Sequence, residues 1–203
     1  MSKKVQKKSS KPVLRAAAGK VLKPSSKKTA VKAGQTAEWK PTKKTAASPV
    51  SLTEGSVAPA FQLPRDGGQN ISLSDYSGRK LVIFFYPRAD TPGCTKEAID
   101  FTRLSDAFAE ARTTVLGVSA DPSKAQEAFR DKYGLSMPLG SDESLAMLKA
   151  YGVWGEKSMY GKTFQGILRT TVLIGADGRI AKIWRNVKVE GHADEVLASA
   201  RRL

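Results

Sequence analysis

The chain has 203 residues, with 34 Lys and Arg against 19 Asp and Glu, one cysteine and one histidine. One cysteine excludes an intramolecular disulfide scaffold, and together with one histidine it leaves too few ligands for a structural zinc site. The apolar run Leu81 to Tyr86 is too short to cross a bilayer, and the Lys-rich start lacks the apolar region of a signal peptide. No nucleotide-binding glycine motif occurs, so we expect no cofactor and no metal.

Residues 1–49 are predicted to be a disordered basic tail. Residues 1–50 hold fourteen Lys and Arg against one acid, Glu38, so they carry most of the net charge of +15. Such a segment cannot bury enough apolar surface to offset the entropy cost of ordering it. A Lys-rich arm can bind DNA or another polyanion by counterion release, whereas the plain alternatives are a solubilising extension or an organelle presequence.

From residue 50 the composition becomes globular, and residues 50–203 are predicted to form one domain. An extended segment, 55–64, leads through a turn at Asp66–Gln69 to a short strand at Asn70–Ser74. Leu81–Tyr86 has the β-branched and aromatic pattern of a strand that is buried on both faces. After Gly93 the pattern is helical, with Phe101, Leu104, Phe108 and Ala111 on one face.

The remaining segments alternate between strands and helices. A strand at Thr113–Ser119 precedes a helix that Asp121-Pro122-Ser123 opens and that runs to about Tyr133, with Asp121 or Ser119 as its cap and Pro122 in its first turn. Leu139 lies in a short strand, and Asp142 to about Tyr151 reads as a helix with Leu145 and Leu148 inward. Two strands flank the turn Ala176–Gly178, and His192–Leu203 is a closing helix. This order favours an α/β fold with a central mixed sheet flanked by helices.

Cys94 therefore lies where a buried strand ends and a helix begins. Backbone N–H groups of the first helical turn have no intrahelical partner and favour negative charge, so a thiolate is stabilised there. Thr91 can place a hydroxyl beside the sulfur. The plain alternative is that a lone cysteine is a small buried apolar residue.

The pattern Pro87-x-x-x-Thr91-x-x-Cys94 resembles the active-site signature of the peroxiredoxins. The surrounding residues 86–98, together with segments 151–162, 166–171 and 187–197, resemble the bacterioferritin-comigratory (Q-type) subgroup of the AhpC/TSA superfamily. The similarity runs from about Val50 to the C-terminus and leaves the tail outside. It implies a thioredoxin-like fold and a thiol peroxidase that reduces hydrogen peroxide and organic hydroperoxides.

The resemblance also implies site roles. Cys94 would be the peroxidatic cysteine, Thr91 would hydrogen-bond the thiolate and the peroxide, Pro87 would shield the pocket from water, and Arg169 would add positive charge. These donors suit a reaction in which a thiolate attacks one peroxide oxygen and the other leaves with negative charge. His192 is expected to be a helix-start residue and not a catalyst.

In many Q-type members a resolving cysteine lies five residues after the first, where this chain has Ile99. The sulfenic acid on Cys94 must then be reduced by an external thiol such as thioredoxin, glutaredoxin or glutathione, or by a second copy of Cys94. On a regular helix, Ile99 points away from the face that holds Cys94 and is expected to be exposed.

A different class of function remains open: a nucleic-acid-associated redox sensor in which the basic tail is the main functional element. We expect a monomer without membrane contact. The expected location is the cytoplasm, with contact to the nucleoid, and the nucleus is the alternative for a Lys-rich arm.

Overall fold

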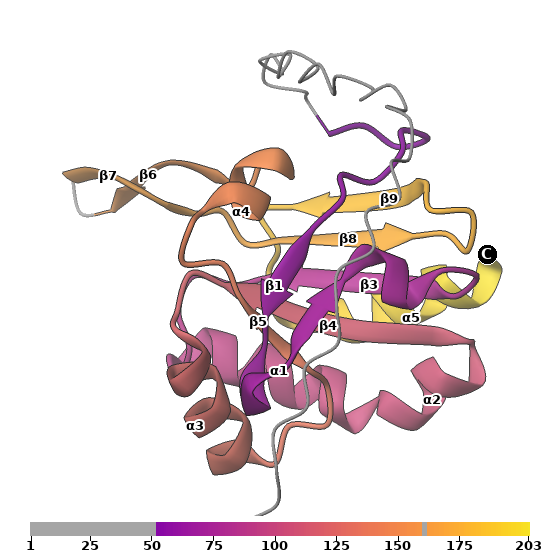
Figure 1. Ribbon diagram of the computed structural model, residues 1–203, viewed down its shortest axis with the longest axis horizontal. Helices are drawn as coiled ribbons and strands as arrows, with labels where there is room; N and C mark the ends of the chain where they lie inside the picture. Colours follow the sequence, from indigo (N-terminus) through magenta and orange to yellow (C-terminus); the bar gives the residue numbers. More distant parts are fainter. Residues whose placement is uncertain (1–51, 160–161) are drawn as a thin grey trace, which may run out of the picture. The chain divides into compact units, whose positions relative to one another are not determined.

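The structure is a computed structural model, and it describes residues 52–159 and 162–203 (Figure 1). The predicted tail, residues 1–49, and the predicted boundary at residue 50 lie outside the described residues. Short 3-10 helices lie at Asp66–Gly68 and Leu73–Tyr76. The strands and α-helices are β1 (Gln62–Pro64), β2 (Asn70–Ser72), β3 (Lys80–Phe85), α1 (Pro92–Arg103), α2 (Ser105–Glu110), β4 (Thr113–Ser119), α3 (Ser123–Tyr133), β5 (Leu139–Ser141), α4 (Ala146–Ala150), β6 (Trp154–Met159), β7 (Lys162–Ile167), β8 (Thr170–Ile174), β9 (Ile180–Arg185) and α5 (His192–Arg202).

A five-stranded mixed sheet forms the centre of the described part. The strand order is β5-β4-β3-β8-β9, with β3, β4 and β5 parallel and with β8 and β9 antiparallel to their neighbours. Strand β3 lies in the middle, and Leu81 to Tyr86 are at most 1% exposed. The apolar run that predicts a doubly buried strand is therefore confirmed, as is the mixed sheet.

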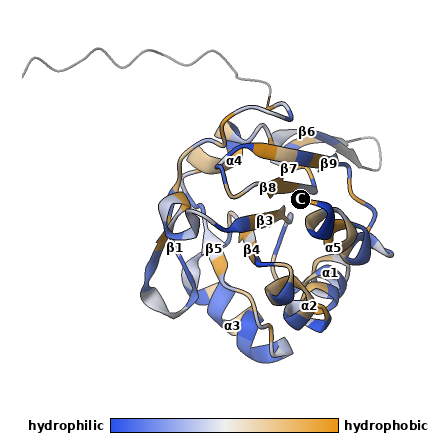
Figure 2. Ribbon diagram, turned by 90° about the vertical axis from the view of Figure 1, so that its right-hand side faces the viewer, coloured by the Kyte–Doolittle hydropathy of each residue, from blue (hydrophilic) through white to orange (hydrophobic). Residues whose placement is uncertain are grey.

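Alternate residues of β3 pack into two separate apolar clusters. Leu81, Ile83 and Phe85 join the cluster that includes β1 and α4 residues, whereas Val82 and Phe84 join the cluster of α1, α2 and α5. Figure 2 shows α1, α2 and α5 gathered on one side of the sheet. Helices and loops thus cover both faces, in agreement with the predicted α/β architecture.

The predicted helix after Gly93 is in fact two helices. Helix α1 ends at Arg103 and α2 begins at Ser105, and Leu104 between them has φ −99° and ψ 9°. Phe101 and Phe108 are nevertheless both buried, and their ring centroids are 5.9 Å apart. The apolar spacing predicted which residues face the sheet, but it did not reveal the break.

Two predicted helix starts need correction. Asp121 does not cap α3, because its carboxylate accepts hydrogen bonds from the Ala89 backbone N–H (2.7 Å) and from the Ser119 hydroxyl (2.8 Å). The predicted helix from Asp142 begins only at Ala146, after Leu145, whose φ is +62°. The buried Asp142 carboxylate instead accepts bonds from backbone N–H groups at the start of α4.

The β6–β7 hairpin was not predicted from the sequence. Its two strands pair with each other in a separate sheet, from Trp154 opposite Ile167 to Met159 opposite Lys162. Two residues after β7 comes Arg169, and then β8 begins. The β8–β9 hairpin and helix α5 are confirmed where the sequence predicts them. Among the described residues, no helix combines the length and the apolar composition that a membrane span requires.

Candidate active site

Cys94 lies in the first turn of α1, at the end of the loop that follows β3. Thr91 is the N-cap residue, Pro92 occupies the first helical turn, and Cys94 is 1% exposed. Proline suits the first turn because the N–H that it lacks would have no intrahelical partner. The local sequence therefore places a buried cysteine in the first turn of a twelve-residue helix, as predicted, where the backbone N–H groups have no intrahelical partner and favour negative charge.

Arg169 lies 75 positions after Cys94 in the chain and brings a positive charge to the sulfur. Its Nη2 donates a hydrogen bond to Cys94 Sγ at 3.2 Å, and its Nη1 donates to Glu97 Oε2 in a buried ion pair. The Arg169 side chain is 17% exposed and that of Glu97 is 1% exposed. One guanidinium thus bridges the sulfur and a carboxylate that lies one helical turn after Cys94.

Glu97 is a site residue that the sequence reasoning missed. Burial raises the pKa of Glu97 to about 7, and the positive charge of Arg169 opposes this shift. Within the described residues its Oε1 has no hydrogen-bond partner, and neither does the buried hydroxyl of Thr95. A signal was present: residues three apart share a helix face, so an acid at this position faces inward with Cys94 and needs a cation.

Lys157 on β6 is a second cation, close enough to Arg169 and Cys94 to interact with their charges, and it was also missed. Its Nζ donates to the Ile167 carbonyl at 2.6 Å, so it links the two strands of the hairpin just before Arg169. Burial lowers the pKa of Lys157, and the charge of Arg169 lowers it further. The β6–β7 hairpin therefore supplies a positively charged surrounding and not merely a spacer.

The other two predicted site residues, Thr91 and Pro87, precede Cys94 in the loop after β3, but neither of these described residues is hydrogen-bonded to its sulfur. The Thr91 hydroxyl donates to the Arg88 carbonyl at 2.9 Å, and Pro87 is half-buried in the loop after β3. No hydrogen bond joins Thr91 to Sγ in the described part of the chain. The roles implied for Thr91 and Pro87 remain predictions.

His192 is the first residue of α5 and is 5% exposed, so the prediction of a helix-start residue agrees with its position. Its Nε2 lies 2.8 Å from the Thr171 hydroxyl, and burial lowers the pKa of His192 to about 4. The ring also packs edge-on against Phe101 and Trp184. Ile99 is 43% exposed, which confirms that it points away from the buried face of α1.

This arrangement can stabilise a sulfur anion and the negative charge that develops on an oxygen beside it. The guanidinium and the helix N–H groups are fixed donors in a site that excludes most water, where such donors act most strongly. Among the described residues no group of three or more metal ligands occurs. The buried cysteine beside a fixed guanidinium suits nucleophilic chemistry at sulfur.

The comparisons with known proteins agree with this chemistry. The AhpC/TSA family model matches residues 55–183. Peroxiredoxin Bcp of Xanthomonas campestris is 44% identical over 146 residues, covering 71% of this chain and 91% of the relative. Peroxiredoxin Bcp of Escherichia coli K12 is 40% identical over 146 residues, covering 72% and 94%.

Solved structures give the same result for the fold. A mutant of Xylella fastidiosa PrxQ is 39% identical with a TM-score of 0.71, covering 74% of this chain and 96% of that one. A structure of Xanthomonas campestris peroxiredoxin Q is 44% identical with a TM-score of 0.67, covering 70% and 90%. The thioredoxin-like fold that the resemblance implied is thereby confirmed. The chain belongs to the AhpC/TSA family, to its Bcp/PrxQ peroxiredoxins, and it is a thiol peroxidase with a single cysteine.

Proposed function

We propose that this thiol peroxidase works by a one-cysteine cycle centred on Cys94. The Cys94 thiolate attacks one oxygen of a hydroperoxide, the O–O bond breaks, and the other oxygen leaves as hydroxide or alkoxide and takes up a proton. Cys94 is left as a sulfenic acid. The observation that supports this cycle is the guanidinium of Arg169 at 3.2 Å from the sulfur, where it can stabilise the charge that develops.

An external thiol then completes the cycle, because the chain has no second cysteine. A first thiol condenses with the sulfenic acid to give a mixed disulfide and water. A second thiol attacks that disulfide, releases Cys94 and forms the oxidised reductant. Glutathione, glutaredoxin and thioredoxin are the candidate reductants.

The remaining roles complete the proposal. Thr91 turns its hydroxyl from the Arg88 carbonyl toward the bound peroxide, and Pro87 limits the access of water.

We infer that hydrogen peroxide and organic hydroperoxides are both substrates, since the Xanthomonas campestris bacterioferritin comigratory protein has alkyl peroxide reduction activity. The enzyme acts as a monomer in the cytoplasm, which sedimentation and cell fractionation would test.

Stopped-flow measurement of Cys94 oxidation by hydrogen peroxide tests the cycle, with Cys94→Ser as the blank. The expected rate constant exceeds that of a free thiol by orders of magnitude. Mass spectrometry of the product should then show a sulfenic acid, which glutathione or thioredoxin returns to the thiol. A rate like that of a free thiol would refute the proposal.

A second function rests on the charge of the tail. Fourteen basic residues against one acid in residues 1–50 favour contact with DNA or another polyanion, and so with the nucleoid. Deleting residues 1–48 should leave peroxidase activity unchanged and abolish salt-sensitive DNA binding. DNA binding that survives the deletion would show that the tail is not the anchor.

A further inference from the structure

A cavity of about 470 Å³ lies at the end of the sheet remote from Cys94. Strands β3 and β4 are parallel, and the cavity adjoins Thr113–Val115 at the start of β4, whereas the Cys94 loop leaves the far end of β3. It exists because β5 pairs only with Gly117–Ser119, so the first half of β4 has no strand on that side. Helix α2 and residues 136–138 form its walls.

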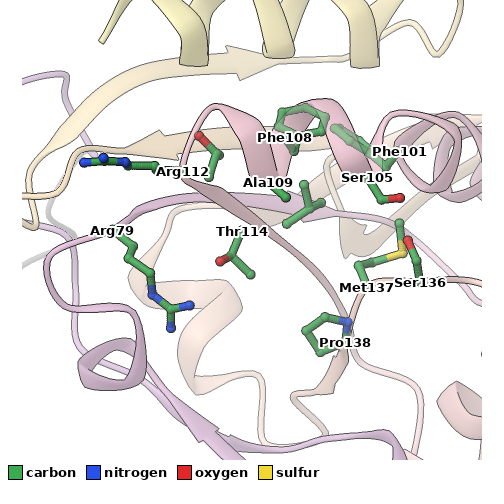
Figure 3. A pocket seen from close by; sticks show the side chains of 12 residues that line it. Arg79, Phe101, Ser105, Phe108, Ala109, Arg112, Thr114, Ser136, Met137 and Pro138 are labelled. Atoms are coloured by element: carbon green, nitrogen blue, oxygen red, sulfur yellow. The ribbon is translucent and has the colours of Figure 1, made fainter.

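One end of this cavity is apolar, and its wall consists of Phe101, Phe108, Val115, Met137 and Pro138. Figure 3 shows the aromatic rings and Met137 at this end and the two arginines at the other. The hydroxyls of Ser105, Thr114 and Ser136 also line the cavity, and none of them makes a hydrogen bond to another side chain or backbone group of the described residues. An apolar cavity of this size with a few polar groups is typical of small-molecule sites.

The other end is positively charged. Arg79 and Arg112 line both this cavity and an adjoining one of about 550 Å³, which Lys80 and Arg201 also line, with Glu110 as the acidic side chain. Within the described part of the chain, Arg79, Arg112 and Arg201 form no ion pair. Arg79 Nη2 donates to the Asp75 carbonyl at 2.8 Å, and its remaining N–H groups and those of Arg112 can pair with an external anion.

Arg112 also occupies a backbone position that normally favours glycine. It follows α2 with φ +51°, and its N–H bonds the Ala109 carbonyl at 2.8 Å. A left-handed conformation strains a side chain such as arginine, whereas glycine adopts it freely. A change to glycine would therefore remove the charge without straining the backbone.

We propose that this cavity binds an amphipathic organic anion, namely a medium-chain aliphatic carboxylate. Its chain would lie against Phe108, Met137 and Pro138, and its carboxylate would pair with Arg79 and Arg112. Charge argues against the other occupants: the Lys-rich residues 1–49 would meet like charge. A second copy docked through the same face would bring one cluster of Arg79, Arg112 and Arg201 toward another.

Titration of the full chain with decanoate, followed by amide chemical shifts in NMR, tests the proposal. Shifts should occur around Phe108, Thr114 and Met137 and not around Cys94. Arg112→Gly should weaken binding by at least about tenfold, because a hydrogen bond to a charged group is lost. Ala109→Glu should weaken it similarly by charge repulsion, and Ala128→Glu, an equal change on the exposed side of α3, should not.

Matched ligands separate the two parts of the proposal. Decanol lacks the charge, propionate lacks the chain, and decylammonium reverses the charge, so each should bind at least about tenfold more weakly than decanoate. Every variant retains the basic tail, so tail binding cancels when variants are compared with one ligand, and the shifts around Phe108, Thr114 and Met137 report binding at the cavity when ligands are compared. Equal binding to the Arg112→Gly variant, or of decylammonium, would overturn the proposal. So would an acidic extended peptide that binds this edge of β4 when decanoate does not.

Discussion

Replacing Arg169 with methionine would remove the guanidinium that bridges Cys94 and Glu97 while keeping most of the apolar stem. Glu97 would then be left 1% exposed without its partner. Breaking a buried ion pair by removing one member costs about 3–5 kcal/mol when the other stays charged. We expect a loss of this size in the free energy of unfolding at pH 8.

The loss in the free energy of unfolding should increase with pH. The pKa of Glu97 is already raised to about 7 by burial, and Arg169 is the main opposing charge, so the substitution raises it further. A carboxyl whose pKa is higher in the folded state than in the unfolded state does not weaken the fold at a pH below its unfolded-state pKa. It destabilises the fold increasingly as the pH rises through the folded-state pKa. The destabilisation should therefore be smaller at pH 5.5 than at pH 8.

The same variant should lose activity for a separate reason. Without the donor at 3.2 Å from Sγ, the rate of Cys94 oxidation should fall by about 100- to 1000-fold. The double variant Arg169→Met/Glu97→Gln removes both members of the buried ion pair, so it should regain most of the stability but none of the rate. Urea unfolding at both pH values and stopped-flow oxidation provide the two measurements.

Three results would refute this reasoning. The double variant could remain as unstable as Arg169→Met at pH 8, so that the buried charge is not the cause. It could regain the rate, so that the guanidinium is not the donor. Alternatively, Arg169→Met could keep the wild-type rate at every pH.

Further predictions concern Glu97 by itself, His192 and Ile99. Glu97→Gln should remove from the pH profile of Cys94 oxidation the inflection near pH 7 that a titrating Glu97 causes, and an unchanged profile would contradict that role. Because His192 is buried neutral, wild type should lose up to about 2–3 kcal/mol relative to His192→Gln between pH 6.5 and 4, measured by urea unfolding. Ile99→Cys should fold normally and form a disulfide after peroxide treatment, detected by mass spectrometry. It should form slowly, since residues five apart on a helix are about 8–9 Å apart and α1 must unwind; no disulfide at all would contradict it.

The local pattern of the chain was sufficient to predict the elements that hold Cys94. Burial on both faces selects β-branched and aromatic residues along β3, and prolines and glycine mark the turn before α1, so strand, turn and helix are all encoded within about twenty residues. The exposure of Ile99 followed from helical periodicity alone. The role of Arg169 was expected from the family resemblance, but no local pattern predicted its position beside the sulfur.

The tertiary structure decided the contacts between residues that are far apart in the chain. Arg169 meets Cys94 across 75 positions, and the β6–β7 hairpin that brings it there has too few apolar residues to be recognised as paired strands. The hydrogen bond that the Asp121 carboxylate accepts likewise depended on a distant segment, because its donor is the Ala89 backbone N–H. The periodicity of apolar residues predicts which face of an element is buried, because burial requires only an apolar side chain at each position on that face. It does not report which side chain lies opposite, because that depends on how the elements pack, and here packing alone paired Glu97 with Arg169.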